Sequence, residues 1–266
     1  MKKILLIVLF ITGVCFGQTH EFAEEFYKNG IPKVIKTYKE SNDKYELVKF
    51  ISLYENGQKE KENTYKNGKP NGKWTGWHSN GQKSKEGTYK DGVKNGYWTE
   101  WYNTGQKKIE EAYKDDKRDG KWTGWHSNGQ KSKEGTYKDG LNNGNWTEWY
   151  NNGQKKIEEA YKDGKLDGKT IRWYENGQKA IEGAYKDGKL NGKWIRWADD
   201  GSLTIKLTLH DGKISDTEIN AFKSLLIING RFDCFDGSKS IVASWVNDNE
   251  CDCNDCSDEP LRQPNY

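Results

Sequence analysis

Residues whose chemistry could serve a binding site gather near the C-terminus of this 266-residue chain. Its last four cysteines lie within one 23-residue stretch: Cys234, Cys251, Cys253 and Cys256. Residues 230–266 also hold eight aspartates and glutamates against three lysines and arginines. Closely spaced thiols form disulfides in an oxidising compartment, and crowded carboxylates become favourable around a divalent cation such as Ca²⁺. We therefore expect a separate acidic module at this end of the chain.

The N-terminus predicts the oxidising compartment that disulfides need. Two lysines follow Met1, an apolar run covers residues 4–14, and Cys15 and Gly17 provide small side chains at both cleavage-site positions. This order is typical of a secretory signal peptide, so we expect cleavage after Gly17 and export to the periplasm, the cell envelope or the extracellular space. The apolar run is too short to span a bilayer. A lipoprotein signal acylated at Cys15 is the alternative, although the residues just before it match that motif poorly.

With the leader removed, the four remaining cysteines suggest two disulfides. Four short elements surround them: F-x-C from Phe232, I-x-x-x-W from Ile241, D-C-x-D from Asp252 and S-D-E from Ser257. These elements and their spacing resemble the LDL-receptor class A module. The resemblance implies one Ca²⁺, held by the side chains of Asp248, Asp252, Asp258 and Glu259 and by the backbone carbonyls of Trp245 and Glu250. It also implies a Cys234–Cys253 bridge, with Cys251 and Cys256 as the remaining pair.

The module departs from its family, which usually has six cysteines, because the first, third and fourth are missing here. Two other interpretations remain open. The stretch could be a solvated acidic tail that disulfides merely crosslink. Alternatively, Cys251, Cys253 and Cys256 could bind zinc, although an exported, carboxylate-rich setting suits that metal poorly. An EF-hand-like fragment around Asp211 is excluded, because leucines at positions 207 and 209 replace its first two ligands.

Elsewhere, residues capable of acid–base chemistry recur instead of gathering into one site. His78 and His126 are copies 48 residues apart, and tyrosine replaces them in other copies, which indicates packing rather than catalysis. Five glutamates recur every 24 residues and face recurring lysines, as cross-strand ion pairs would: Glu86, Glu110, Glu134, Glu158 and Glu182. No nucleophile elbow, P-loop, zinc-helix motif or dinucleotide fingerprint occurs in the sequence. We therefore expect no enzyme and no catalytic residues.

These residues belong to a 24-residue period, which is the signature of a repeat array. Glycine recurs in phase from Gly72 to Gly192, and one tryptophan column runs from Trp74 to Trp194 with Thr170 as its exception. A second column is expected to form the binding surface: Trp77, Trp101, Trp125, Trp149, Trp173 and Trp197. Residues 73–120 and 121–168 agree at 42 of 48 positions, which indicates a recent duplication of a two-repeat unit.

Turn dipeptides separate the aromatic runs, as at Asn80-Gly81 and Asp91-Gly92. Both central residues of a type I′ turn need positive φ, which Asn-Gly and Asp-Gly favour, so each repeat is predicted to be a β-hairpin. Hairpins pairing edge to edge would give a mainly β fold, an elongated single-sheet β-hairpin solenoid whose stability is a sum over neighbours. Alternation places Trp74 on one face and Trp77 on the other, so aromatic side chains cover both faces.

The pattern G-x-W-x-x-W-x-x-N-G-Q-K-x-x-E-x-x-Y-K-D-G extends over roughly residues 50–213. It resembles the MORN-variant repeat, a family sometimes labelled YwqK-like antitoxin component. The resemblance implies a hairpin solenoid used for protein interaction, in some members at a membrane surface, and brings no catalytic residues. Asp116 departs from the turn glycine of the pattern, and Leu209 departs from its tyrosine.

Six segments are expected along the chain: a signal peptide (1–17), an irregular N-terminal cap (18–52), the MORN-variant repeat array (53–213), a capping helix (214–229), the LDL-receptor class A-like module (230–260) and a tail (261–266). The helix is predicted by a capping box from Ser215 to Glu218 and by an apolar stripe that follows it. Laid over the last hairpin, such a helix would cover an open sheet edge.

Composition favours such an array over a layered enzyme fold. Hydrophobic residues make up 33% of the chain and charged residues 31%, yet 12 tryptophans and 15 tyrosines are too many for a disordered coil. Lysines alternate with glutamates instead of forming a basic stripe, which disfavours nucleic acid. We expect a non-enzymatic, exported scaffold for an unknown protein partner. Carbohydrate or cell-wall binding through the Trp/Tyr ladder and toxin-neutralising binding are the alternatives, and association with a membrane surface is compatible with each.

Overall fold

The computed structural model describes residues 18–41, 44–213, 231–233 and 240–242. Their secondary structure is β-strand, and no helix occurs among these described residues. The chain divides into two compact units, residues 1–131 with 137–140 and residues 132–136 with 141–266. The expected mainly β architecture is confirmed. The predicted capping helix over 214–229 lies outside the described residues.

The strands of the first unit are β1 (Thr19–Phe26), β2 (Pro32–Ser41), β3 (Lys44–Leu53), β4 (Lys59–Lys66), β5 (Lys69–Trp77), β6 (Lys83–Lys90), β7 (Val93–Trp101), β8 (Lys107–Lys114) and β9 (Lys117–Trp125). Residues of β10 (Lys131–Lys138) occur in both units. The second unit contains β11 (Leu141–Trp149), β12 (Lys155–Lys162), β13 (Lys165–Trp173), β14 (Lys179–Lys186), β15 (Lys189–Leu190), β16 (Gly192–Trp197) and β17 (Leu203–Leu209). Two short strands follow, β18 (Arg231–Asp233) and β19 (Ser240–Val242).

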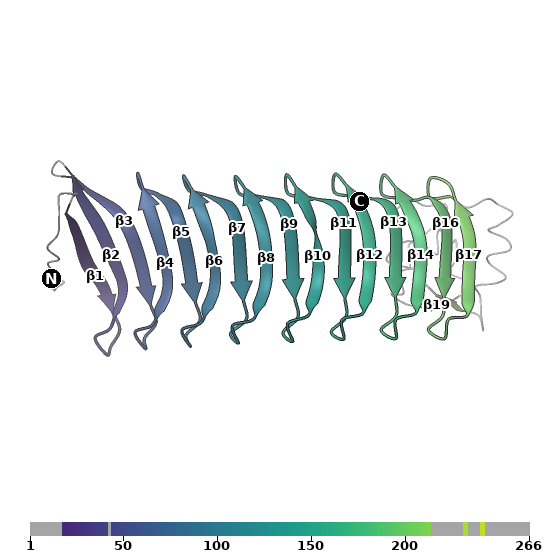
Figure 1. Ribbon diagram of the computed structural model, residues 1–266, viewed down its shortest axis with the longest axis horizontal. Coiled ribbons are helices and arrows are strands. Elements are labelled where there is room, and N and C mark those ends of the chain that lie inside the picture. The colour runs from purple at the N-terminus through teal and green to yellow at the C-terminus, as the bar shows by residue number, and fades with distance from the viewer. Residues whose placement is uncertain (1–17, 42–43, 214–230, 234–239, 243–266) are drawn as a thin grey trace. The chain divides into compact units, whose positions relative to one another are not determined.

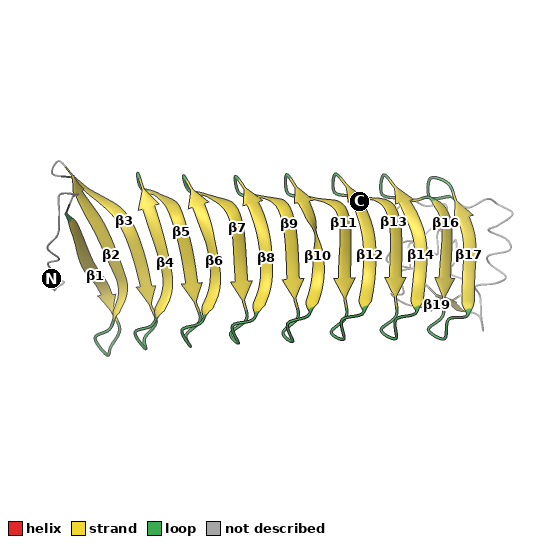
Figure 2. Cartoon of the chain, viewed as in Figure 1, coloured by secondary structure: helices red, strands yellow, loops and turns green. Residues whose placement is uncertain are grey.

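Within each unit, consecutive strands pair antiparallel in chain order, as Figure 1 shows. Short turns connect them, which is the connection that antiparallel neighbours allow (Figure 2). In the described part of the first unit, β1 pairs with β2 alone, so the sheet is open at β1. Residues of β18 pair with β19, with Phe232 opposite Ile241.

One end of the strands is built from two-residue turns with positive φ at both positions. Between β6 and β7, φ is 51° at Asp91 and 94° at Gly92, which confirms the predicted type I′ turn at this dipeptide. Asp116, which stands where the pattern has glycine, also has positive φ, at 65°. Its carboxylate accepts a hydrogen bond of 2.7 Å from the Lys94 amide. This bond to the preceding turn offsets the cost of the left-handed backbone at a residue with a side chain.

The Asn-Gly dipeptides at the opposite end of the strands form a different turn. The Gly81 amide donates to the His78 carbonyl at 2.9 Å, and the His78 amide donates to the Gln82 carbonyl at 2.8 Å. Gly81 has a φ of 84°, whereas Asn80 is not among the residues with positive φ. The prediction of a type I′ turn at Asn80-Gly81 is therefore wrong. Asn80 instead accepts the Gln82 amide at 3.1 Å through its side chain, and only the glycine is left-handed.

The glycine column marks a bulge inside the repeat. The register between β4 and β5 shifts between Asn63 and Tyr65, and Gly72 on the facing strand has a φ of 99°. Beside it, the Thr64 hydroxyl donates to the Asn71 carbonyl at 2.6 Å. A Cβ at Gly72 would lie 2.6 Å from that hydroxyl oxygen. Backbone angle and space both require glycine at this position. Positive φ recurs at Gly96, Gly144 and Gly192, where space does not exclude a Cβ, so the backbone angle explains the recurrence.

The largest fully buried side chain of the first unit is a tryptophan on one face of the sheet. Trp98 is only 1% exposed. Its ring lies over Gly87 of the neighbouring strand, where a Cβ would come within 2.1 Å of the indole. Trp74 and Tyr89 contact the ring with centroid separations of 5.6 and 5.1 Å, and Lys94 Nζ lies 4.8 Å from its centre. Burial is therefore lateral, by neighbours on the same face.

The residue beside these tryptophans alternates between glycine and a polar side chain. Gly87, Gly135 and Gly183 make room for Trp98, Trp146 and Trp194. In the intervening repeat, Glu111 stands opposite Trp122 and is 4% exposed. It accepts hydrogen bonds from the Tyr113 hydroxyl at 2.9 Å and from Arg118 Nε at 2.8 Å. The 48-residue period thus has a packing cause, because large and small side chains alternate along the face.

Residues 18–52, expected as an irregular cap, form strands that continue the pattern of the repeats. β1, β2 and β3 pair in order, and β3 pairs with β4. The Tyr27 hydroxyl donates to the Leu53 carbonyl at 2.9 Å, as the Tyr54 hydroxyl donates to the Trp77 carbonyl at 2.7 Å. The structural repeat therefore begins before its sequence pattern becomes visible.

We expect Gly87→Ala to destabilise the first unit by ~1–3 kcal/mol, because the added Cβ would overlap the Trp98 ring. Gly96→Ala is the control. No atom lies within 4 Å of a Cβ there, so its left-handed φ of 76° is the only source of strain, at about 1 kcal/mol. Chemical denaturation of the full chain measures both. Equal losses of stability would contradict the seating of Trp98 on Gly87.

Candidate interaction surface

The six tryptophans of the predicted binding surface, here called the tryptophan row, each end a strand. They are the last residues of β5, β7, β9, β11, β13 and β16: Trp77, Trp101, Trp125, Trp149, Trp173 and Trp197. All six are half-buried. The register shifts directly before Trp77 and again before Trp101, so the rings stand at bulges beside the turns. The row is part of the sheet and still accessible from solvent.

A column of hydroxyl and imidazole groups ties each turn to the next tryptophan. The Tyr54 hydroxyl donates to the Trp77 carbonyl at 2.7 Å, and His78 Nε2 lies 3.1 Å from the Trp101 carbonyl. The tyrosines that replace histidine in other repeats make the same bond at 2.8 Å. Because a carbonyl only accepts, the His78 ring presents an N–H there, as tyrosine presents its O–H. These contacts agree with a structural role for His78.

Lysines cap the rings of the tryptophan row. Lys59 Nζ lies 5.5 Å from the centre of the Trp77 ring, and Lys83 Nζ lies 5.8 Å from that of Trp101. The contact recurs at 5.6, 5.8 and 5.9 Å for Trp125, Trp173 and Trp197. An ammonium group at this distance is attracted by the electron-rich face of the indole. The surface is therefore a ladder of alternating cationic and aromatic groups.

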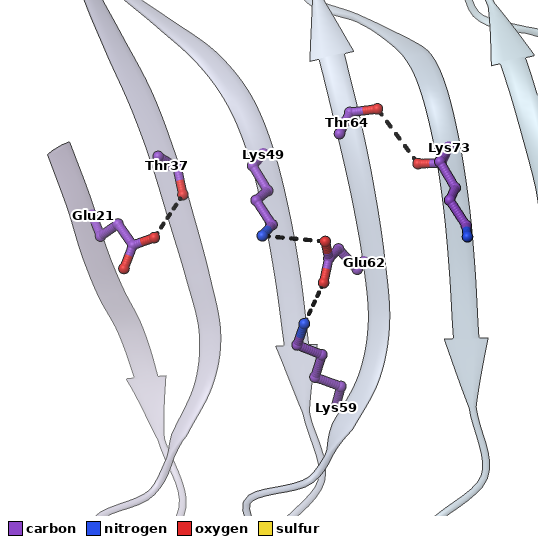
Figure 3. A network of polar contacts seen from close by, with 7 residues as sticks. All are labelled: Glu21, Thr37, Lys49, Lys59, Glu62, Thr64 and Lys73. Atoms are coloured by element: carbon purple, nitrogen blue, oxygen red, sulfur yellow. Dashed lines mark hydrogen bonds and ion pairs between the residues drawn. The ribbon is translucent and has the colours of Figure 1, made fainter. Parts of the chain in front are cut away.

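Each capping lysine also pairs with a glutamate. Lys59 Nζ lies 2.5 Å from Glu62 Oε2, and Lys49 Nζ lies 3.1 Å from Glu62 Oε1, so two lysines share one carboxylate (Figure 3). Glu86 binds Lys83 and Lys73 in the next repeat, at 2.6 and 2.9 Å. The predicted cross-strand ion pairs are confirmed at Glu86, with Lys73, and at Glu182, with Lys169. Glu110 and Glu158 instead pair with the lysine three residues earlier on their own strand.

Paired lysines change how these glutamates titrate. At Glu182, hydrogen bonds from Lys169 and Lys179 hold the pKa of the carboxyl below its ordinary value. At Glu86, burial raises the pKa, but the hydrogen bonds of its two lysines outweigh burial and leave the pKa lowered. The carboxylates of Glu86 and Glu182 are therefore stabilised in their charged form at neutral pH.

The opposite face, which carries the buried tryptophans, has a different electrostatic character. Burial, followed by the hydrogen bond to Glu111, raises the pKa of Tyr113 to about 12. Lys94 Nζ lies over the rings of Trp98 and Tyr113 at 4.8 and 4.7 Å, and burial lowers the pKa of this lysine. Groups held this closely serve packing, so this face is the structural one.

Hollows beside the row are shallow. One is lined by Gln178, Lys179, Trp197 and Gly201. The same residue types recur with the period at Gln58, Lys59, Trp77 and Gly81. The residue types that line this hollow therefore belong to the repeat pattern.

The predicted calcium ligands and cysteines all lie outside the described residues: Trp245, Asp248, Glu250, Asp252, Asp258, Glu259, Cys234, Cys251, Cys253 and Cys256. The calcium site and the disulfides stay predictions. Within the described ranges, no group of three or more histidine, cysteine or acidic side chains could hold a metal ion. The same ranges contain no helix of the length and hydropathy that a membrane crossing requires.

A family model for the MORN repeat variant matches six consecutive segments: residues 48–67, 70–91, 94–115, 118–139, 142–163 and 166–187. The segment 70–91 covers β5, the turn after it and β6, so one match corresponds to one strand pair. The chain carries six tandem MORN repeats. A search of curated proteins found no match. The resemblance to MORN-variant repeats is thus confirmed between residues 48 and 187.

Sequence reasoning placed the tryptophan row and its glutamates but missed the lysine caps. Their signal was present, because Gln-Lys follows the turn glycine in each matched repeat: Gly57, Gly81, Gly105, Gly129, Gly153 and Gly177. A bulge beside the turn brings this lysine both to the next tryptophan and to a glutamate three residues on. Simple alternation along a strand does not predict that geometry.

Glu182→Gln should reduce the dependence of stability on pH in the second unit. The folded pKa of Glu182 lies below its reference value of 4.5, so the charged group stabilises the fold above the unfolded-state pKa. That contribution is lost as pH falls through the folded pKa. Because the pair is partly exposed, the loss in the variant should stay under about 1 kcal/mol near neutral pH and vanish in acid.

Denaturation curves at neutral and acidic pH measure this effect, with Glu175→Gln in the turn before β14 as the control. A wild type and a Glu182→Gln variant that lose stability in parallel across this range would show that the ion pairs contribute nothing.

Proposed function

We propose that the protein is a non-enzymatic, exported scaffold that binds a protein partner through the tryptophan row. One observation supports this most directly. The same lysine-capped indole recurs in both units, with Nζ-to-ring distances between 5.5 and 5.9 Å. A surface that repeats one chemical unit fits an extended macromolecule better than a small substrate, which needs a single differentiated site.

The composition of the row suits a protein interface. Half-buried tryptophans provide large rigid contact area, and aromatic residues of this kind carry much of the binding energy in interfaces. Lysine and glutamate side chains flank them and supply both signs of charge. Such a rim favours a partner with a complementary charge pattern.

The lysine caps also favour a protein over a carbohydrate. Sugars bind tryptophan by stacking on an open ring face, and the ammonium groups of Lys59 and Lys83 already lie over the Trp77 and Trp101 rings. A sugar would have to displace a lysine that also pairs with a glutamate. Toxin neutralisation names one class of protein partner and fits the same surface.

We further propose that the C-terminal module binds one Ca²⁺ after export. This part rests on the sequence, where clustered carboxylates and cysteines follow the LDL-receptor class A pattern. Oxygen ligands of this kind suit Ca²⁺, and disulfides persist outside the reducing cytosol. The leader-like N-terminus supports the same compartment.

Replacing two members of the row tests the scaffold proposal. Trp101→Ala combined with Trp125→Ala should weaken partner binding at least about 30-fold, the loss expected when a hot-spot aromatic is truncated. Affinity capture from the source cells, with mass spectrometry and then a binding titration on the captured protein, measures it. Tyr45→Ala is the control, because Tyr45 is a 58% exposed aromatic outside the row.

A partner retained equally by the double variant would exclude the row as the binding surface. Retention of a glycan instead of a protein, lost in the same variant, would favour the carbohydrate alternative. Circular dichroism melting of each variant confirms that the sheet is intact.

Calorimetry on the full chain tests the calcium proposal. Added Ca²⁺ should release or absorb heat with one site per chain and raise the melting temperature, and Asp252→Ala should abolish both effects. Asp236→Ala is the control, since Asp236 is acidic but not at a ligand position of the family pattern. No heat and no change in melting would remove the site.

A further inference from the structure

Two glutamates of the ladder show how this surface binds cations. Glu62 receives Lys49 on Oε1 at 3.1 Å and Lys59 on Oε2 at 2.5 Å. Glu182 receives one lysine on each oxygen in the same way, Lys169 at 2.7 Å and Lys179 at 2.5 Å. One lysine of each pair is three residues before the glutamate, and the other comes from the facing strand. The repeat thus contains a two-cation clamp around one carboxylate.

The facing-strand lysine has a fixed place in the register. Lys73 lies opposite Thr88, and its glutamate is Glu86, two residues before Thr88 on the same strand. Residues placed diagonally in this way are within reach of a long side chain. The lysine of the clamp is therefore set by strand pairing and can be located in every repeat.

In the next repeat, tyrosine takes the place of this lysine. Tyr97 lies opposite Ala112, and the glutamate two residues before Ala112 is Glu110. Glu110 keeps its other lysine, with Lys107 Nζ 2.5 Å from Oε2. In the described part of the chain, no cation contacts Oε1 of Glu110. Among these residues, Glu110 therefore holds one lysine, where Glu62 and Glu182 hold two.

The exposed fractions of Glu110 and Tyr97 are consistent with the absence, among the described residues, of a second lysine at Glu110. The side chain of Glu110 is 35% exposed, against 24% for Glu62 and 27% for Glu182. Tyr97 is 67% exposed, whereas Tyr89 and Tyr113 on the neighbouring strands are half-buried. Glu158 lacks the same lysine, but Asn145 stands in that place and provides no aromatic ring. At this repeat, the exposed ring of Tyr97 therefore lies on the same face as a carboxylate, that of Glu110, which pairs with one lysine instead of two.

We propose that Tyr97 and Glu110 form an acceptor site for an arginine side chain of the protein partner. This inference rests on the proposed scaffold function and names the chemistry of the partner at one repeat. The guanidinium takes the position that Lys49 and Lys169 hold at Glu62 and Glu182, donating to Oε1 of Glu110. Its plane stacks on the exposed Tyr97 ring, a contact that arginine makes better than lysine. The proposed contact with the partner thus has the same arrangement as the two-lysine contacts of Glu62 and Glu182 within the chain.

Charge complementarity identifies arginine as the occupant. Lys107 already neutralises one oxygen of Glu110, and a second cation completes the arrangement found at Glu62 and Glu182. A neutral side chain would leave the carboxylate as it stands, and an acidic one would be repelled. The exposed ring adds attraction for a planar cation that the other repeats lack.

The test uses nuclear magnetic resonance on the labelled full chain. The probe is the peptide acetyl-Gly-Arg-Gly-amide, and the matched neutral probe carries citrulline in place of arginine. The arginine peptide should shift the signals of Tyr97, Thr99 and Glu110 saturably, while the citrulline peptide should bind about tenfold more weakly or not at all, because the charge-assisted bond is lost.

Two substitutions locate the site. Tyr97→Lys fills the clamp from within the chain, as in the preceding repeat, so it should keep the fold and weaken peptide binding about tenfold. Glu110→Gln should weaken binding comparably. Glu86→Gln is the matched control, because that carboxylate already holds two lysines, and it should leave the affinity unchanged. Amide signal dispersion shows whether each variant is folded.

Equal binding of both peptides, unchanged affinity in Tyr97→Lys, or shifts spread evenly over all repeats would each overturn the site. The scaffold proposal is tested separately by the tryptophan row. A partner lost on row substitution while the arginine peptide fails to bind would remove this inference alone. An arginine peptide that binds at Tyr97 while row substitution leaves partner capture intact would remove the row alone.

Discussion

The constraint behind the rest of the structure is that the described strands of each unit form one layer. A side chain in a layered fold is covered by the opposite layer, but here it can be covered only by neighbours on its own face. Trp98 reaches 1% exposure by lying over Gly87, with Tyr89 beside it and Lys94 above. Large rings, glycine gaps and long lysine stems are therefore requirements of the fold. This explains a chain that is rich in tryptophan and glycine yet only 33% hydrophobic.

The same constraint shapes the ends of the strands. Turns stand beside one another, and bonds from one repeat to the next hold them: Tyr54 to the Trp77 carbonyl at one end, and Gly92 N to the Pro70 carbonyl at the other. Each repeat therefore depends on its neighbour for both packing and hydrogen bonding, and stability is distributed along the array. Asp116 shows how local the effects are. Its left-handed backbone is offset by bonds to Lys94 of the adjacent turn, whose amide donates to the Asp116 carboxylate and whose carbonyl accepts the Asp116 amide.

Much of this could be predicted from the sequence, because the period aligns residues that meet across strands. Glycine, tryptophan and glutamate columns predicted hairpins and ion pairs, and both are present. The errors share one cause. Asn80-Gly81 and Asp91-Gly92 look alike as dipeptides, but the turn type depends on how many residues separate the paired strands. Likewise, the lysine caps depend on a bulge that alternation cannot show. Residues 19–53 form strands whose side chains have diverged from the repeat while the backbone pairing remains.

In a repeat protein, a residue that recurs in every repeat is explained first by the packing and pairing that the sheet requires. The tryptophan row is ambiguous for that reason, since its rings are both packed by lysines and open to solvent. A departure from the period carries more specific information when packing does not require it. Glycine alternating with Glu111 is such a departure with a packing cause, because Glu111 is buried and bonded to Arg118. Tyr97 has no comparable cause: it is 67% exposed, and a lysine in its place would complete an ion pair found in other repeats. Stability alone would favour lysine there, so the exposed ring beside Glu110 is better explained by a contact outside the chain.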